Sequence, residues 1–329
     1  MRNTRRSFIK NSSIILAGTA FLSPGYAVPE GKKEEKVAFQ LYSVDKEMHE
    51  DASGTLKAIR ETGYKYIEHA DYTSRKFYDF SPADFCRLVR DCGLILLSGH
   101  TVLELQHWNK ATKNITSEWQ YTIEDAATAG QQFLITPWLD SSLWNDETAL
   151  KHFMDVFNLS GELCKKAGIQ FGYHNHDFEF AHTFNSLRLY DIILQNADPH
   201  LVFQQLDIGN NYQKSFSVTD LFAQYPGRFQ LMHVKDVKET NERNRQYKSA
   251  LIGEGILDIK NIIDSARLQG GTSYFIIEQD NYAAINSLSS AAQNYQAFNK
   301  INRQSALHSG MLKSDGKALE KQYLPQKYV

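Results

Sequence analysis

The sequence predicts a parallel barrel of eight strand and helix units, a (β/α)8 fold. Short apolar runs alternate with longer helix-like segments from residue 37 to residue 303. Glycine also closes one predicted helix after another just before the next strand, a stop signal that repeats with the strand-helix unit. These glycines are Gly63, Gly93, Gly130 and Gly168.

Each element follows from its local pattern. Buried strands are predicted where four to six apolar residues follow a turn signal. In order they are Val37 to Tyr42, Tyr64 to Glu68, Leu94 to Ser98, Phe133 to Thr136, Ile169 to Tyr173, Leu201 to Leu206, Phe229 to Val234 and Tyr274 to Ile277. The helices between and after them are Ala52 to Thr62, Pro82 to Cys92, Ser117 to Ala129, Glu147 to Ala167, Leu187 to Asn196, Val218 to Gln224, Ile259 to Gln269 and Ala283 to Arg303.

The strand runs are almost continuously apolar, as in a parallel sheet that helices cover. An open, doubly wound sheet is the alternative. Its nucleotide-binding forms lose support, because no Gly-x-Gly-x-x-Gly follows the first strand and no P-loop occurs in the chain. The long polar segment from Asp236 to Asp258 is expected to lie over the catalytic face of the barrel.

The N-terminus has the pattern of a twin-arginine export signal. Arg5 and Arg6 precede an apolar run from Ile14 to Leu22, and small residues at Gly25-Tyr26-Ala27 suit a signal peptidase. The run is shorter than the roughly 20 apolar residues that span a bilayer. We therefore predict a signal peptide at 1–27, a linker at 28–36, a catalytic barrel at 37–305, a C-terminal extension at 306–329, and an exported, periplasmic location without a membrane anchor.

Composition narrows the choice of partners. The formal net charge is −2, and removing the predicted signal makes it −6, which disfavours binding to a nucleic acid backbone. The three cysteines are odd in number, so they are read as buried thiols. A small carbohydrate is the expected partner, and a homo-oligomer is compatible with the sequence.

Four side chains that can bind a metal stand at or just after apolar runs, namely His174, Asp207, His233 and Glu278. They are separated by 33, 26 and 45 residues, near multiples of one strand-helix unit. In a parallel barrel they would converge on one divalent ion. Taken singly, a His or Asp after a strand is more often a capping or hydrogen-bonding residue.

Several motifs together resemble the xylose isomerase-like TIM barrels, which include sugar phosphate isomerases and epimerases. They are Phe39-Gln40-Leu41-Tyr42-Ser43-Val44, Gly63-Tyr64-Lys65-Tyr66-Ile67-Glu68, Tyr173-His174-Asn175-His176, Leu206-Asp207-Ile208-Gly209-Asn210, His233-Val234-Lys235-Asp236, Gly253-Glu254-Gly255-Ile256-Leu257-Asp258 and Glu278. The resemblance implies one divalent ion held by a Glu, an Asp, a His and a second Glu. The last three fall on Asp207, His233 and Glu278, whereas the first falls on His174.

His174 is a departure from that family, in which two glutamates exchange protons on opposite faces of the substrate. Its presence weakens a symmetric two-base mechanism. Glu278 is then the expected base, and His174 or His176 has a separate catalytic role. The histidine-rich segment also resembles that of inosose dehydratases, which favours elimination. Manganese, zinc or cobalt is expected rather than magnesium.

Substrate contacts are expected at the ends of neighbouring strands. The candidates are Glu68, His100, Trp138 and Lys235, with His176 as a further hydrogen-bond donor. Trp138 has a rim-packing alternative, and Lys235 has a salt-bridge alternative with Asp236 or Glu254. Gln40 and Asn210 could equally be hydrogen bonders at the barrel mouth without a catalytic duty.

The leading functional prediction is a metal-dependent sugar isomerase or epimerase that enolises a keto sugar. One alternative is a lyase or dehydratase that carries out β-elimination on a keto sugar or a 3-keto-glycoside. A second alternative is a carbohydrate-binding barrel without catalysis. A phosphodiesterase of the endonuclease IV type is disfavoured, because Asn210 stands where that pattern has His and no Asp-x-His follows His233.

Overall fold

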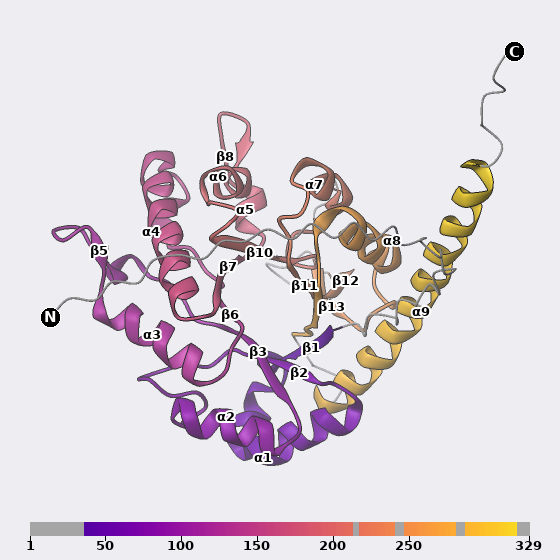
Figure 1. Ribbon diagram of the computed structural model, residues 1–329, viewed down its shortest axis with the longest axis horizontal. Coiled ribbons are helices and arrows are strands. Elements are labelled where there is room, and N and C mark those ends of the chain that lie inside the picture. Colours follow the sequence, from indigo (N-terminus) through magenta and orange to yellow (C-terminus); the bar gives the residue numbers. More distant parts are fainter. Residues whose placement is uncertain (1–35, 213–216, 241–246, 281–286, 321–329) are drawn as a thin grey trace, which may run out of the picture. The chain divides into compact units, whose positions relative to one another are not determined.

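Eight parallel strands close into a barrel in the computed structural model of the chain (Figure 1). The structure describes residues 36–212, 217–240, 247–280 and 287–320, with side chains up to residue 304. In chain order the barrel strands are β1 (Lys36–Gln40), β2 (Tyr66–His69), β3 (Ile95–His100), β6 (Phe133–Thr136), β7 (Gln170–His174), β10 (Val202–Asp207), β11 (Leu231–Val234) and β14 (Tyr274–Ile277). The predicted fold class is confirmed, and every predicted strand boundary is within two residues of the observed one.

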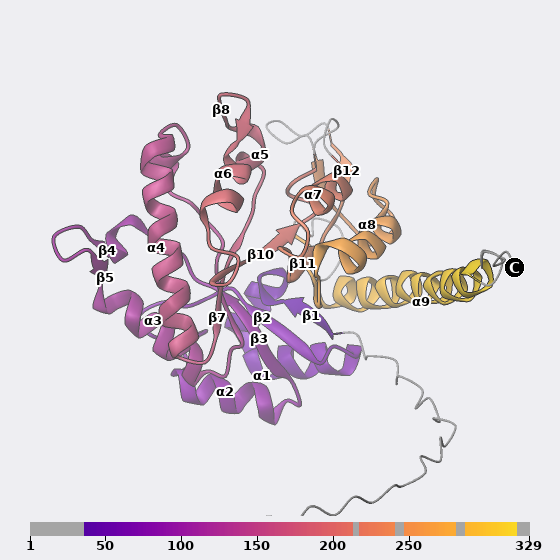
Figure 2. The same ribbon diagram turned by 45° about the horizontal axis from the view of Figure 1, so that its top comes forward.

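Helices cover the outside of this barrel, as Figures 1 and 2 show. They are α1 (Asp45–Thr62), α2 (Pro82–Asp91), α3 (Ser117–Thr128), α4 (Glu147–Lys166), α5 (Phe178–Ala181), α6 (Leu189–Asn196), α7 (Val218–Gln224), α8 (Ile259–Ser265) and α9 (Ser287–Glu320). A π-helical turn, η4 (Ala266–Gly270), continues α8. The predicted helix stops are confirmed: Gly63 ends α1 with φ 117°, a left-handed conformation that favours glycine.

Some predicted helix ends differ from the structure, most of all at the first and last helices. The first helix begins at Asp45 rather than Ala52, directly after a short 3-10 turn, η1 (Leu41–Val44). The last helix runs to Glu320, so the predicted domain boundary at 305 falls within α9. The predicted signal peptide and almost all of the linker lie outside the described residues. Within the described part of the chain, no helix is long and apolar enough to cross a membrane.

The barrel interior is filled at its N-terminal end by apolar and aromatic side chains. Phe133 meets Phe203 and Tyr274 edge to face, with ring centres 5.2 and 5.5 Å apart. Gly172 leaves room for this packing, since a Cβ there would lie 2.4 Å from the ring of Phe203. The polar residues of the same strands therefore collect above this layer, towards the C-terminal ends of the strands.

Strand β3 carries one extra residue where it pairs with β2. Ile67 lies opposite Leu96, but Glu68 lies opposite Ser98, so Leu97 is the inserted residue of a β-bulge. Leu97 packs with the interior apolar cluster, and Ser98 contacts Glu68. The bulge thus turns two consecutive residues of β3 into the barrel and brings the end of the strand towards the same interior.

Short hairpins lie in the loops that follow β3, β7 and β11. They are β4 (Trp108–Asn109) with β5 (Asn114–Ile115), β8 (Thr183–Phe184) with β9 (Leu187–Arg188), and β12 (Asp236–Glu239) with β13 (Tyr247–Ala250). Two further 3-10 turns are η2 (Leu105–His107) and η3 (Ser141–Leu143). The sequence did not predict these small elements. The β12–β13 hairpin occupies the long polar segment that follows β11.

The three cysteines, Cys86, Cys92 and Cys164, are free thiols, but the prediction that all three are buried is wrong for Cys86, which is only partly buried. Cys92 and Cys164 are buried in the shell of apolar side chains between the barrel and its helices. Fold stability in the described region therefore rests on packing rather than on covalent links.

Candidate metal centre

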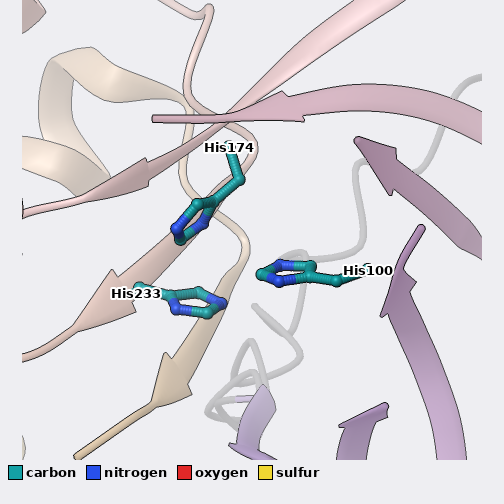
Figure 3. Close-up of side chains that lie close together, drawn as sticks. All are labelled: His100, His174 and His233. Carbon is teal, nitrogen blue, oxygen red and sulfur yellow. The ribbon is translucent and has the colours of Figure 1, made fainter. Parts of the chain in front are cut away.

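The four predicted ligands come together at the C-terminal ends of β7, β10, β11 and β14. His174, Asp207 and His233 lie on the first three of these strands, and Glu278 follows the last residue of β14. All four are buried. Figure 3 shows the rings of His174 and His233 close together, with His100 from β3 pointing towards them from another side.

Two overlapping groups of side chains have ligand atoms within 4.8 Å of one another. One consists of Asp207, His233 and Glu278, and the other of His100, His174 and His233. His233 belongs to both. The geometry therefore offers two candidate sets, and the hydrogen bonds around each imidazole decide which nitrogens are available.

His233 lies between two carboxylates. Its Nδ1 is 2.7 Å from Glu278 Oε2, and its Nε2 is 2.6 Å from Glu68 Oε1. Burial alone would lower the pKa of His233, but the negative charges of Glu68 and Glu278 raise it to about 10. Without an ion the ring is thus a cation that donates to both acids.

His174 has the opposite character. Its Nδ1 is 2.9 Å from Gln205 Oε1, and its Nε2 is 3.9 Å from Asp207 Oδ2. Burial, with the neighbouring positive charges of His233 and His100, holds the pKa of His174 well below its usual range. The ring is neutral, which is the form that binds a metal.

Asp207 has one oxygen engaged and one available. Its Oδ1 accepts the backbone N–H groups of Gly209 and Asn210 at 2.7 and 2.8 Å. Its Oδ2 is buried and has no hydrogen-bond partner among the described residues, although the Lys235 ammonium lies 3.4 Å away. Burial raises the pKa of Asp207, and the charge of Lys235 opposes that rise.

A divalent ion fits this donor set. A buried oxygen without a hydrogen bond is costly unless a ligand satisfies it, and Asp207 Oδ2 lies beside His174, His233 and Glu278. Two imidazoles with two carboxylates suit zinc, cobalt or manganese. His174, Asp207, His233 and Glu278 are the residues that would hold the ion.

Lys235 is almost fully buried among the acids of the site. Besides Asp207, its Nζ lies 3.5 Å from Glu278 Oε2 and 3.3 Å from Asp280 Oδ2. Gly209 makes room for it, because a Cβ there would lie 2.8 Å from Lys235 Cγ. The salt-bridge alternative for Lys235 named Asp236 or Glu254 as the acid. The acids that Lys235 contacts are instead those around the predicted ion.

Glu68 sits beneath the metal ligands rather than at an exposed wall. It is fully buried, and it accepts hydrogen bonds from Gln40 Nε2, Ser98 Oγ and Gln205 Nε2 at 2.7, 2.5 and 2.6 Å. His100 Nε2 is 3.1 Å away. The predicted substrate contact of Glu68 stays a prediction. The observed contacts make it a support for His233.

The predicted substrate residues lie around the ion site. His100 keeps 13% of its side chain exposed, and its ring centre is 4.7 Å from that of His174. Trp138, on the loop after β6, is 41% exposed and packs edge-on against His176 at 5.1 Å. Burial lowers the pKa of His176 to about 4, so this ring is neutral. Trp138 therefore combines rim packing with an accessible ring.

Gln205 is the site residue that the sequence analysis missed. Its side chain touches Glu68, His100 and His174 together. The period of two along a strand offered the signal, since Gln205 precedes Asp207 by two residues and so shares its face. Gln40, for which the sequence suggested a place at the barrel mouth, binds Glu68 inside the barrel.

Solved structures of similar fold include sugar-converting enzymes. A sugar phosphate isomerase/epimerase from Parabacteroides distasonis is 24% identical, with a TM-score of 0.66 over 82% of this chain and 94% of that one. An L-ribulose 3-epimerase is 13% identical, with a TM-score of 0.62 over 84% and 98%. The IolI protein with a bound zinc atom is 14% identical, with a TM-score of 0.63 over 81% and 97%. At these identities the likeness concerns the fold.

Curated relatives point to the same group of proteins. An inosose dehydratase from Geobacillus thermodenitrificans is 22% identical over 162 residues, which are 46% of this chain and 53% of that protein. An inosose dehydratase from Lactiplantibacillus plantarum is 24% identical over 179 residues, 50% and 56% of the two chains. The matched segments thus span about half the length of these relatives. Residues 56–301 match the family model for xylose isomerase-like TIM barrels, and the chain belongs to that family.

Proposed function

We propose that this chain is a divalent-metal-dependent enzyme that enolises a keto sugar, as an isomerase or epimerase. The observation that carries the proposal is the convergence of His174, Asp207, His233 and Glu278 around the buried, unbonded Oδ2 of Asp207. When bound, the ion would polarise a substrate carbonyl and stabilise the enolate that proton removal produces.

The residues of the chain supply the remaining roles. Burial alone would raise the pKa of Glu278, but Lys235 and His233 hold it well below its usual range, so Glu278 is an ionised carboxylate that can accept a proton. In this proposal, Lys235 and His176 would hold substrate oxygens. Trp138 is a partly exposed aromatic residue at the rim, and a sugar ring could stack on such a side chain.

The second candidate function is elimination, and the imidazole at position 174 favours it. A symmetric epimerisation needs a base on each face of the substrate carbon. His174 is fully engaged by Gln205 and by the predicted ion, which leaves one carboxylate base, Glu278. A single base suits isomerisation or β-elimination from a keto sugar or 3-keto-glycoside. The inosose dehydratase relatives support this second candidate.

The first experiment measures bound metal on the purified protein and on Asp207→Asn, with Asp280→Asn as the matched control. Asp280 is a carboxylate that contacts Lys235 but lies outside the predicted ligand set. We expect about one ion per chain in the wild type and the control, and little in Asp207→Asn. Absence of metal from all three after reconstitution would refute metal dependence and favour the carbohydrate-binding barrel.

The second experiment separates the reactions. A panel of keto sugars and 3-keto-glycosides is incubated in heavy water with the metal-loaded enzyme. Isomerisation or epimerisation conserves the substrate mass apart from exchanged deuterium, whereas elimination releases water or an aglycone. Export through the twin-arginine pathway belongs to the same proposal. Cell fractionation beside an Arg5→Lys/Arg6→Lys variant tests it, because the variant should remain unprocessed inside the cell.

A further inference from the structure

A buried pair, Glu68 and Gln205, underlies both imidazoles of the candidate metal centre. The two side chains come from β2 and β10 and are joined by a hydrogen bond of 2.6 Å from Gln205 Nε2 to Glu68 Oε2. Both are fully buried. Each of them then contacts one predicted metal ligand, so the pair connects His233 and His174 from below.

Glu68 determines which ring nitrogen of His233 must carry a hydrogen. Both oxygens of Glu68 already accept hydrogen bonds, Oε1 from Gln40 Nε2 and Oε2 from Ser98 Oγ and Gln205 Nε2, so this contact geometry is that of a carboxylate. An ionised carboxylate only accepts hydrogen bonds, so His233 Nε2, 2.6 Å away, must carry a proton. If His233 gives up one proton to become a ligand, the nitrogen left for the ion is Nδ1.

The side-chain amide of Gln205 determines in turn which ring nitrogen of His174 carries a hydrogen. Because Gln205 Nε2 donates to Glu68, the amide oxygen must face the other way, towards His174 Nδ1 at 2.9 Å and His100 Nε2 at 2.7 Å. An amide oxygen is an acceptor, so both of these nitrogens carry hydrogens. His174 is left with a lone pair on Nε2, the nitrogen that faces Asp207 Oδ2.

We propose that Glu68 and Gln205 act as one positioning unit that sets opposite tautomers of the two imidazole ligands. His233 then presents Nδ1, and His174 presents Nε2, to a single ion beside Asp207 and Glu278. The inference rests on the proposed function in placing an ion there. It also makes His100 Nε2 and His174 Nδ1 donors to Gln205, so neither of these two nitrogens is available to an ion.

The test compares Gln205→Leu with Ser98→Ala. Leucine keeps approximate volume but cannot accept from His174, and Ser98 donates to the same oxygen of Glu68 at 2.5 Å without being an imidazole partner. Zinc affinity is measured by chelator competition. We expect Gln205→Leu to lose about 10- to 100-fold in affinity, as for other groups that orient metal-bound histidines. Ser98→Ala should stay within a few-fold of the wild type.

The second measurement identifies the tautomers of the histidine rings. Long-range nitrogen-proton NMR of ¹⁵N-histidine-labelled protein distinguishes the two tautomers of each neutral ring. The ion-free wild type should show His174 protonated at Nδ1, a pattern that Gln205→Leu loses and Ser98→Ala keeps. In the zinc form, His233 should be bound through Nδ1. An Nε2-bound His233, or an unchanged His174 pattern and unchanged affinity in Gln205→Leu, would overturn the inference.

Two further variants test the inference independently of Gln205→Leu. If Gln205→Leu does not fold, Gln205→Asn replaces it, because the shorter amide cannot span Glu68 and His174 together. The exchange Glu68→Gln/Gln205→Glu restores one acid and one amide, and we expect it to recover affinity relative to Glu68→Gln alone. If the wild type binds no ion, the proposed function fails, whereas the His174 pattern in ion-free protein still decides whether Gln205 sets its tautomer.

Discussion

The buried carboxyl group of Glu179 is expected to make the folded chain less stable as the pH rises towards about 8. This carboxyl group is fully buried on α5, where Tyr173 hydroxyl donates to Oε1 and His176 N–H donates to Oε2 at 2.8 Å. Burial raises the pKa of Glu179 from 4.5 to about 8, against the lowering effect of these hydrogen bonds. The perturbation is Glu179→Gln, in which the amide imitates the protonated acid.

The direction in which stability changes with pH follows from proton binding. Between pH 4.5 and about 8 the folded state keeps a proton on Glu179 that the unfolded state releases. The folded state therefore loses stability as pH rises through this window, while stability is fully retained below 4.5. A tenfold change in proton affinity corresponds to about 1.4 kcal/mol, so the rise in the pKa of Glu179 sets an upper bound of about 5 kcal/mol. We expect on the order of 2 kcal/mol, because the protein relaxes around a buried charge.

The assay is urea unfolding at pH 5.5 and pH 8.5 for wild type, Glu179→Gln and the exposed control Glu162→Gln. Other groups titrate in all three proteins, so the informative quantity is the difference between their pH dependences. The wild type and the control should lose about 2 kcal/mol more than Glu179→Gln between the two pH values. Parallel pH dependences for wild type and Glu179→Gln would refute the assignment of a raised pKa to this carboxyl group.

Three other predictions concern single contacts. Lys235→Met should lower the melting temperature of the ion-free protein, because two buried carboxylates lose a cation, and should enlarge the melting-temperature rise on adding zinc. Gly161→Ala should cost about 1–3 kcal/mol in urea unfolding, because its Cβ would lie 2.4 Å from the Leu201 carbonyl oxygen. The neighbouring Ser160→Ala is the control, since its buried hydroxyl has no hydrogen-bond partner among the described residues and its loss should be nearly neutral. Asp236→Asn should speed amide hydrogen exchange in the loop after β13 and leave the barrel strands unchanged, because the carboxylate accepts three backbone N–H groups of that loop.

The barrel and the meeting of the four metal ligand candidates could be predicted because they depend on long-range regularities. Parallel strands place their C-terminal ends on one side, so side chains at matching ends converge whatever the loops do. His174, Asp207, His233 and Glu278 therefore approach one another as expected. The small hairpins and η1 could not be predicted, because two-residue strands and single turns carry too few residues for a periodic pattern.

The contacts of Glu68 with Ser98 and His100 were harder to predict, and strand β3 shows why. Strict alternation from the interior residue Leu97 would place Gly99 inside the barrel, and Ser98 and His100 outside it. The bulge at Leu97 reverses this for the rest of the strand and turns Ser98 and His100 towards Glu68.

The run Ile95-Leu96-Leu97 is apolar on both faces, so nothing in the local sequence marks the inserted residue. Leu96 and Leu97 are both buried, on opposite sides of the strand, so the inserted residue exposes neither of them. The only indication of the bulge is the buried carboxylate of Glu68, which needs the hydrogen-bond donors that the bulge turns towards it. The hydrogen-bond requirement of that acid is what ties the end of β3 to the metal centre.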